Sequence, residues 1–303
     1  MPDHRTGRQE KRRAFRPTLD GKLETRVLMA TSAIHAQTAA GGQAVVVTNT
    51  SGARFYVSVT NGGTVRATPA SGGRVNLVVD GTNSGSLVEI NRVVPGNQRG
   101  MAHTFQPGVG NSMPRLNLAS VRITSGMVSA IEGYQTAELS GPITVAGSVR
   151  VDRIALSSIL AGGSISVSGD LNTLDIYRNV NLSGGSISVG RDLNWFQTFG
   201  NVSITNNSNI IVGRYLGLTA QPAKGSGNAG QGMYVGGNLT IDSTSSFAIG
   251  QYLAGTMSGG AGILINGNFS GISRFFILGF PAYPPSPASN LFGGINVLGT
   301  LAA

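Results

Sequence analysis

A repeated hexapeptide restricts what this chain can fold into more than any other feature does. Gly-Gly-Ser-Ile-Ser-Val occurs at residues 162–167 and again at 184–189, 22 residues later. A looser pattern, two apolar residues four positions apart with a glycine between or beside them, extends the series. Its copies stand at 145–149, 167–171, 189–193, 212–216, 235–239, 249–253, 265–269 and 297–301. Self-similarity at a period of about 20–50 residues is typical of repeat proteins, in which similar units stack.

Within the repeat, apolar residues alternate with small polar ones, as in Ile165 and Val167 or Ile187 and Val189. Alternation with period two indicates β-strands with one buried face. A unit of 22 residues with two or three short strands cannot bury its own apolar face, so successive units must stack. The sequence therefore predicts an all-β fold, a parallel β-solenoid (β-helix) with coils of about 22 residues. Neighbouring coils would lie about 4.8 Å apart.

Glycine and asparagine are expected to shape the corners of each coil. Sharp corners need residues that tolerate positive φ, which glycine adopts without steric cost. We therefore expect positive φ at the glycines of the pattern, namely Gly169, Gly190, Gly213 and Gly236. Asn172 and Asn194 keep the same 22-residue offset, so their side chains are predicted to form a hydrogen-bonded ladder.

The chain divides into four segments. Residues 1–43 form a basic export or sorting segment and linker, whose first part is expected to be disordered. Residues 44–112 are strand-rich and fit either early coils or a small β cap. Residues 113–280 carry the solenoid repeats, and residues 281–303 hold a proline-rich break and a C-terminal strand. Proline cannot donate to a strand ladder, so the break is expected to end the solenoid.

Composition excludes several classes of function. The chain has 303 residues with no cysteine and three histidines, which rules out disulfides, thiol nucleophiles and cysteine-ligated metal. No nucleotide-binding loop, zinc-protease helix or serine-hydrolase elbow occurs. The net charge is +9, but eight of the 22 basic residues lie in the first 30 positions. The body is sparsely charged, so we expect no nucleic-acid partner, and no stretch is long enough for a membrane-spanning helix.

The end of the basic segment resembles a known export motif. Residues 23–30 read Leu-Glu-Thr-Arg-Val-Leu-Met-Ala, which is similar to the LEPR-XLL motif near the N-terminus of many exported planctomycete proteins. Thr25 stands where that family has proline, and Met29 replaces its second leucine. The matching positions are Leu23, Glu24, Arg26, Val27 and Leu28. The resemblance implies an extracellular or cell-surface protein.

The acidic candidates for a catalytic site are Asp152, Asp170, Asp175 and Asp192, and one pair of them stands out. Asp170 and Asp192 occupy equivalent positions one coil apart, with Arg191 beside them. Two adjacent carboxylates can share a proton or bind Ca²⁺, as a polysaccharide lyase or glycoside hydrolase would require. The alternative is that both are turn aspartates neutralised by Arg191. We favour this alternative, because the fold by itself places equivalent residues side by side. No other metal or cofactor site is expected.

Aromatic residues near the same repeat are candidates for stacking on a sugar, namely Trp195, Phe196, Phe199 and Tyr215. The favoured interpretation is that they pack in the core or in turns. The favoured function is a non-enzymatic, exported surface protein that is structural or adhesive and binds a polysaccharide or cell-wall component. Self-association along the solenoid is a further possibility. Two alternatives stay open: a β-helix polysaccharide lyase or glycoside hydrolase using the Asp170/Asp192 region, and a fragment of a larger secreted passenger.

Overall fold

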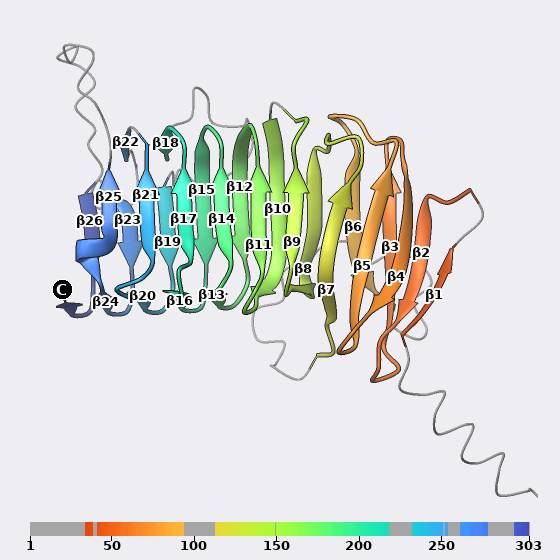
Figure 1. Cartoon of the computed structure of the whole chain (residues 1–303), viewed down its shortest axis with the longest axis horizontal. Helices are drawn as coiled ribbons and strands as arrows, with labels where there is room; N and C mark the ends of the chain where they lie inside the picture. The colour runs from red at the N-terminus through yellow and green to blue at the C-terminus, as the bar shows by residue number, and fades with distance from the viewer. Residues whose placement is uncertain are drawn as a thin grey trace, which may run out of the picture.

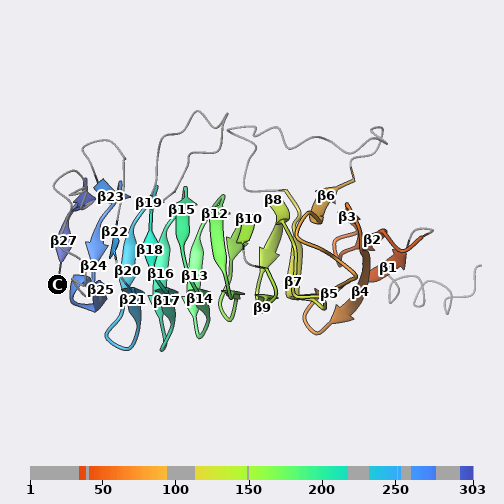
Figure 2. The ribbon, with the colours of Figure 1, turned by 90° about the horizontal axis from the view of Figure 1, so that it is seen from above.

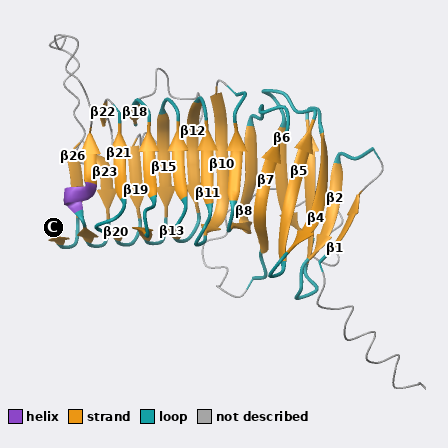
Figure 3. Ribbon diagram, in the orientation of Figure 1, coloured by secondary structure: helices purple, strands orange, loops and turns teal. Residues whose placement is uncertain are grey.

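A computed structural model describes residues 34–38, 41–93, 113–148, 150–217, 232–250, 252–253, 261–277 and 294–302. These residues are almost entirely β-strand and form one rod of stacked strands (Figure 1). The single helical element among them is a turn of 3-10 helix, Ile272–Arg274 (Figure 3). Residues 1–33, which include the basic residues and the stretch that resembles an export motif, lie outside the described residues. Within the predicted linker, His35–Thr38 form strand β1.

Two consecutive coils show how the repeat folds. The first consists of β11 (Ser164–Val167), β12 (Asp170–Ile176) and β13 (Val180–Ser183), and the second of β14 (Ser186–Val189), β15 (Leu193–Thr198) and β16 (Val202–Thr205). Each strand pairs in parallel with its equivalent 22 residues later, as Ile165 does with Ile187 and Val180 with Val202. The prediction of a parallel β-solenoid with 22-residue coils is confirmed.

The remaining coils continue three ladders of parallel strands. Side one runs through β8, β10, β12, β15, β19, β23 and β26, side two through β9, β11, β14, β17, β21 and β25, and side three through β13, β16, β20, β24 and β27. Sides one and two lie on opposite flanks of the rod (Figure 2). The bounds are β7 (Leu116–Ile123), β8 (Ala130–Leu139), β9 (Pro142–Val145), β10 (Arg150–Ile159), β17 (Asn209–Val212), β18 (Tyr215–Leu216), β19 (Gly232–Val235), β20 (Leu239–Ile241), β21 (Ser246–Ile249), β22 (Tyr252–Leu253), β23 (Ala261–Ile265), β24 (Phe269–Ser270), β25 (Phe275–Ile277), β26 (Gly294–Val297) and β27 (Leu301–Ala302).

The eight copies of the glycine pattern form two columns, not the single series that the sequence suggests. Copies at 145, 167, 189, 212 and 249 stack at the corner between sides two and one. Copies at 235, 265 and 297 stack at the corner between sides one and three, above residues 198–202. Residues 198–202 are a further copy of the pattern, but Thr198 stands where the other copies have their first apolar residue, so the sequence search does not detect it. The two corners at the ends of side one have the same local requirements. The later spacings are irregular because copies from both corners follow one another along the chain.

The ladder also continues beyond the proline-rich stretch, contrary to expectation. β26 pairs with β23 and β27 with β24. Residues 278–293, which contain the prolines, lie outside the described residues.

The glycines of the pattern do not have the positive φ that was expected. None of Gly169, Gly190, Gly213 and Gly236 falls in that region, whereas Gly162 (φ 80°) and Gly184 (φ 73°) do. The reason is close approach between coils. A Cβ on Gly213 would lie 2.1 Å from the carbonyl oxygen of Gly190, and one on Gly190 would lie 2.2 Å from that of Ser168.

Asparagine ladders hold the corners together. The Asn194 side chain donates to Asn172 Oδ1 at 2.9 Å, so the predicted pair is confirmed. A longer ladder, which the sequence analysis missed, runs along the corner between sides one and three. There, each side-chain Oδ1 accepts the backbone N–H of the next coil at 2.8–2.9 Å, through Asn179, Asn201, Asn238, Asn268 and Thr300. These bonds satisfy backbone donors that turn away from the strands.

The N-terminal strands form an antiparallel cap. They are β1 (His35–Thr38), β2 (Ala44–Thr48), β3 (Arg54–Thr60), β4 (Thr64–Ala70), β5 (Arg74–Asp80) and β6 (Leu87–Arg92). β2 pairs with β3, β3 with β6, and β4 with β5, all antiparallel. β5 and β6 then pair in parallel with β7 and β8. The described strands before β7 are therefore antiparallel to one another, and their apolar residues join those of the solenoid in one continuous core.

Candidate functional site

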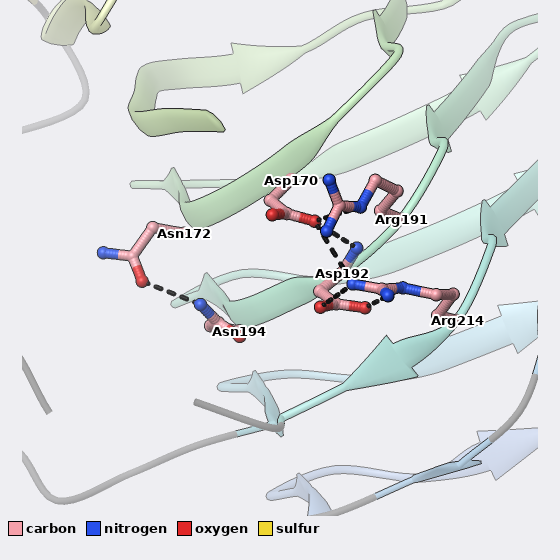
Figure 4. Close-up of polar contacts among 6 residues, drawn as sticks. All are labelled: Asp170, Asn172, Arg191, Asp192, Asn194 and Arg214. Atoms are coloured by element: carbon pink, nitrogen blue, oxygen red, sulfur yellow. Dashed lines mark hydrogen bonds and ion pairs between the residues drawn. The ribbon is translucent and has the colours of Figure 1, made fainter. Parts of the chain in front are cut away.

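The Asp170/Asp192 pair lies at the corner between sides two and one. Asp170 is the first residue of β12, and Asp192 directly precedes β15. The two aspartates occupy successive coils, and the Asp192 backbone N–H donates to Asp170 Oδ1 at 3.2 Å. Arg191 Nε lies 3.3 Å from Asp170 Oδ1. Arg214 binds Asp192 with two donors, Nη2 to Oδ2 at 2.6 Å and Nε to Oδ1 at 3.0 Å (Figure 4).

Arginine partners give this pair a structural role. Arg214 Nη2 also lies 3.8 Å from Asp170 Oδ1, so two guanidiniums and two carboxylates form an alternating cluster across three coils. Two-donor contacts between arginine and carboxylate are strong and fix the geometry. The arrangement favours turn aspartates neutralised by arginine over a catalytic or Ca²⁺-binding pair. Arg191 was the expected partner, while Arg214 was not foreseen.

The aromatic candidates do not all share a surface. Successive residues of a strand point to opposite faces, so Trp195 and Phe196 on β15 cannot both face outward. Phe196 is fully buried in the core and is therefore wrong as a ligand-binding residue. Trp195 is half-buried on the outer face, where its Nε1 donates to Gln197 Oε1 at 3.1 Å. Tyr215 lies at the corner, with the Arg214 guanidinium 5.5 Å from its ring centroid.

A row of aromatic side chains, which the sequence analysis missed, runs along side one. Ring centroids are 6.3 Å apart for Tyr134 and Tyr177, 6.0 Å for Tyr177 and Phe199, and 6.1 Å for Phe199 and Tyr234. These residues come from β8, β19 and the ends of β12 and β15, so the row follows the rod axis. Phe199 is 42% exposed. We call these four residues, together with Trp195, the aromatic face.

Part of this row could have been predicted from the spacing of Tyr177 and Phe199 in the sequence. They are 22 residues apart, which is the coil repeat, so both lie at the same position of successive coils. Tyr234 escapes the pattern because it is in register with Gln197, two residues before Phe199, and because its coil is longer than 22 residues. Trp195 and Phe199 were both named from the sequence as candidates for stacking on a sugar, although packing in the core or in turns was the favoured interpretation. Tyr134, Tyr177 and Tyr234 were not named.

A charged group lies within the aromatic face. Arg153 on β10 stands between two carboxylates, with its Nε 3.3 Å from Asp175 Oδ2 on β12 and its Nη1 3.8 Å from Glu132 Oε1 on β8. The Asp175 side chain is only 7% exposed, compared with 46% for Arg153. Asp175 is in register with Gln197, which is in register with Tyr234. The charged group and the aromatic rings therefore belong to one surface.

Burial decides the protonation behaviour of this group. Burial, together with the charge of Glu132, raises the pKa of Asp175 to about 6, although the charge of Arg153 acts to lower it. Burial, with the charge of Asp175, raises the pKa of Tyr134 to about 12. A neutral tyrosine and a carboxyl that titrates near neutral pH can donate hydrogen bonds as well as accept them.

Asp175 makes the stability of the fold depend on pH. Its pKa is raised from an ordinary 3.8 to about 6, so the folded state binds the proton more tightly than the unfolded state does. The free energy of unfolding should therefore fall by up to about 3 kcal/mol as the pH rises from about 4 to above about 6. Urea unfolding across this range, compared with Asp175→Asn, measures it. The variant should lack this part of the pH dependence, and an unchanged profile in the variant would contradict the assignment.

Comparisons with other proteins do not assign this surface to a known family. No family model, curated protein or solved structure matches the chain. Among the described residues, no group of three or more histidine, aspartate or glutamate side chains is placed to hold a metal ion. The described part of the chain also has no helix of the length and hydrophobicity that a bilayer span requires.

Proposed function

We propose that this protein is a non-enzymatic β-solenoid of the cell surface or extracellular space, which holds a polysaccharide chain against its aromatic face. The row of Tyr134, Tyr177, Phe199 and Tyr234 carries the proposal. Export rests on the resemblance of residues 23–30 to the LEPR-XLL motif and stays a prediction.

The chemistry of sugars supports an aromatic binding surface. A sugar ring presents C–H groups on its faces and hydroxyl groups around its rim. Aromatic side chains offer a large apolar surface, with a polar group as well in tyrosine and tryptophan. Because the rings repeat along the rod axis, one extended polymer can contact several of them at once. Several weak contacts on one polymer give a higher overall affinity than each would alone.

The enzymatic alternative receives less support. A lyase or hydrolase at Asp170 and Asp192 would need carboxylates available to the substrate, and both are paired with Arg191 or Arg214. A surface that binds along its length requires no such site. We therefore propose adhesion or attachment to a polysaccharide as the function, with no turnover.

Electrophoresis of the full chain through gels that contain polysaccharide tests the proposal. A polysaccharide that binds the wild-type protein should slow its migration. Phe199→Ala should weaken this binding about tenfold, because an exposed ring that contacts the sugar is lost. Tyr56→Ala is the matched control, since Tyr56 is 40% exposed, close to the 42% of Phe199, but lies on β3 of the cap.

Two outcomes of that experiment would contradict the proposal. The first is that no polysaccharide, neutral or acidic, slows the wild-type protein. The second is that Phe199→Ala and Tyr56→Ala bind as the wild type does. Location is tested separately, by fractionating cells and determining the native N-terminus by mass spectrometry. Export predicts a surface or medium fraction whose chain begins after about residue 30.

A further inference from the structure

The charges on the aromatic face restrict which polysaccharide can bind there. Glu132 and Asp175 contribute two carboxylates, and Arg153 stands between them as their shared cation. Aromatic ring faces are themselves electronegative. The neighbouring Gln197 adds a neutral amide, which is already hydrogen-bonded to Trp195. This group therefore has two carboxylates for one cation, and it offers hydrogen-bonding groups without an excess of positive charge.

We infer that the aromatic face takes an uncharged polysaccharide rather than an acidic one, and that Arg153 is the polar residue that orients its hydroxyl groups. This inference rests on the proposed function and specifies its ligand. Arg153 is the most exposed member of the charged group, with 46% of its side chain accessible, against 19% for Glu132 and 7% for Asp175. A guanidinium has five N–H donors, and the two carboxylate contacts involve only its Nε and Nη1.

An acidic polysaccharide would meet charges of its own sign at this face. Its carboxylates would approach Glu132 and Asp175, and like charges close together repel one another strongly where water is displaced. Arg153 is already compensated by Asp175 at 3.3 Å, so it cannot serve as a free cation for a uronic acid. An uncharged sugar avoids this repulsion, because its hydroxyl groups can donate to the carboxylates and accept from Arg153.

From the net charge of the chain alone, one would expect an acidic polysaccharide to bind better than an uncharged one. The two expectations differ, so an experiment can decide between them. A protein with a net charge of +9 attracts polyanions by general electrostatics, and such binding weakens as salt screens it. Binding to an uncharged polysaccharide should change little with ionic strength. The type of polymer bound and the salt dependence therefore separate the two mechanisms.

Arg191 provides a matched control for Arg153. Each has its Nε 3.3 Å from an aspartate oxygen of a neighbouring coil, and their side chains are 44% and 46% exposed. Arg191 lies at the corner beside Asp170 and not within the aromatic face. Removing either charge lowers the net charge equally, so only a local role of Arg153 predicts different results for the two variants.

The experiment uses the full chain in gels that contain laminarin or glucomannan as uncharged probes, and polygalacturonate or alginate as acidic ones. At high ionic strength the uncharged probes should still slow the wild-type protein, and the acidic probes should not. Arg153→Gln should weaken binding to the uncharged probe about tenfold, whereas Arg191→Gln should leave it unchanged. Arg153→Lys keeps the charge but loses the planar set of donors, so it should also weaken binding.

Each outcome of this experiment has a definite meaning. Circular dichroism establishes that the variants fold, and if Arg153→Gln does not, Arg153→Lys decides the question. Retention by acidic probes only, lost at high salt and reduced equally by Arg153→Gln and Arg191→Gln, would overturn the inference but leave polysaccharide binding in place. Equal binding of the uncharged probe by wild type and both Arg153 variants would also overturn it. Failure of every probe to slow the wild type would instead refute the proposed function.

Discussion

Phe196→Ala should lower the free energy of unfolding by about 4 kcal/mol, whereas Trp195→Ala, one residue earlier, should lower it by about 1 kcal/mol. Phe196 is fully buried and lies in register with Leu174 and Met233, which are also fully buried. Removing its ring would leave a cavity that the stacked coils on either side cannot close. Trp195 faces outward and would lose partial burial and its hydrogen bond to Gln197.

Urea unfolding followed by far-ultraviolet circular dichroism measures both variants against the wild type. The two substitutions should also separate in function. Trp195→Ala should weaken polysaccharide binding while the fold persists, and Phe196→Ala should bind normally under conditions where it remains folded. Equal destabilisation by the two variants, or a larger loss with Trp195→Ala, would mean that the alternation along β15 is wrongly assigned.

Gly213→Ala should destabilise the protein by about 3 kcal/mol or more. The added Cβ would lie 2.1 Å from the Gly190 carbonyl oxygen and 2.7 Å from its carbonyl carbon. The backbone cannot relieve this contact without opening the ladder, because the Gly213 N–H donates to Val189 O at 2.8 Å. On the other side, Gly250 approaches Gly213 in the same way, since its Cβ would lie 1.9 Å from the Gly213 oxygen.

Gly184→Ala is the matched comparison and should be milder, at about 1–2 kcal/mol. Gly184 has φ of 73°, which strains any other residue, but no atom lies within 4 Å of the position its Cβ would take. Thermal and urea unfolding of both variants give the order of the effects. If Gly184→Ala proves the more damaging, then backbone conformation, and not close approach of coils, explains the glycines of the repeat.

Much of the fold could be predicted because a solenoid converts sequence separation into spatial proximity. The offset of 22 residues placed Ile165 beside Ile187 and Asn172 beside Asn194, and both pairs are present. It also placed Asp170 next to Asp192. What that pair does could not be predicted in full, since Arg214 reaches it from a third coil.

The candidate site was harder to predict for two physical reasons. Coils of unequal length break the 22-residue spacing. In addition, Tyr234 on β19 is in register with Gln197 and not with Phe199, although the rings of Tyr234 and Phe199 are 6.1 Å apart. Outward positions also lack the apolar alternation that marks the core, so nothing in the pattern joined Glu132, Arg153 and Asp175. Of the residues on this face, the sequence pointed only to Trp195 and Phe199.

The amino-acid sequence by itself determined the class of fold, the coil length and the pairing of equivalent residues in coils of equal length. These follow from the alternation of apolar residues and from a constant spacing, which are properties of the chain taken in one dimension. The tertiary structure decided that the glycine pattern marks two corners, that its glycines serve close approach, and that four aromatic rings and one charged group share a face. Those features depend on how coils of different lengths align around a common core, and no local pattern records that alignment.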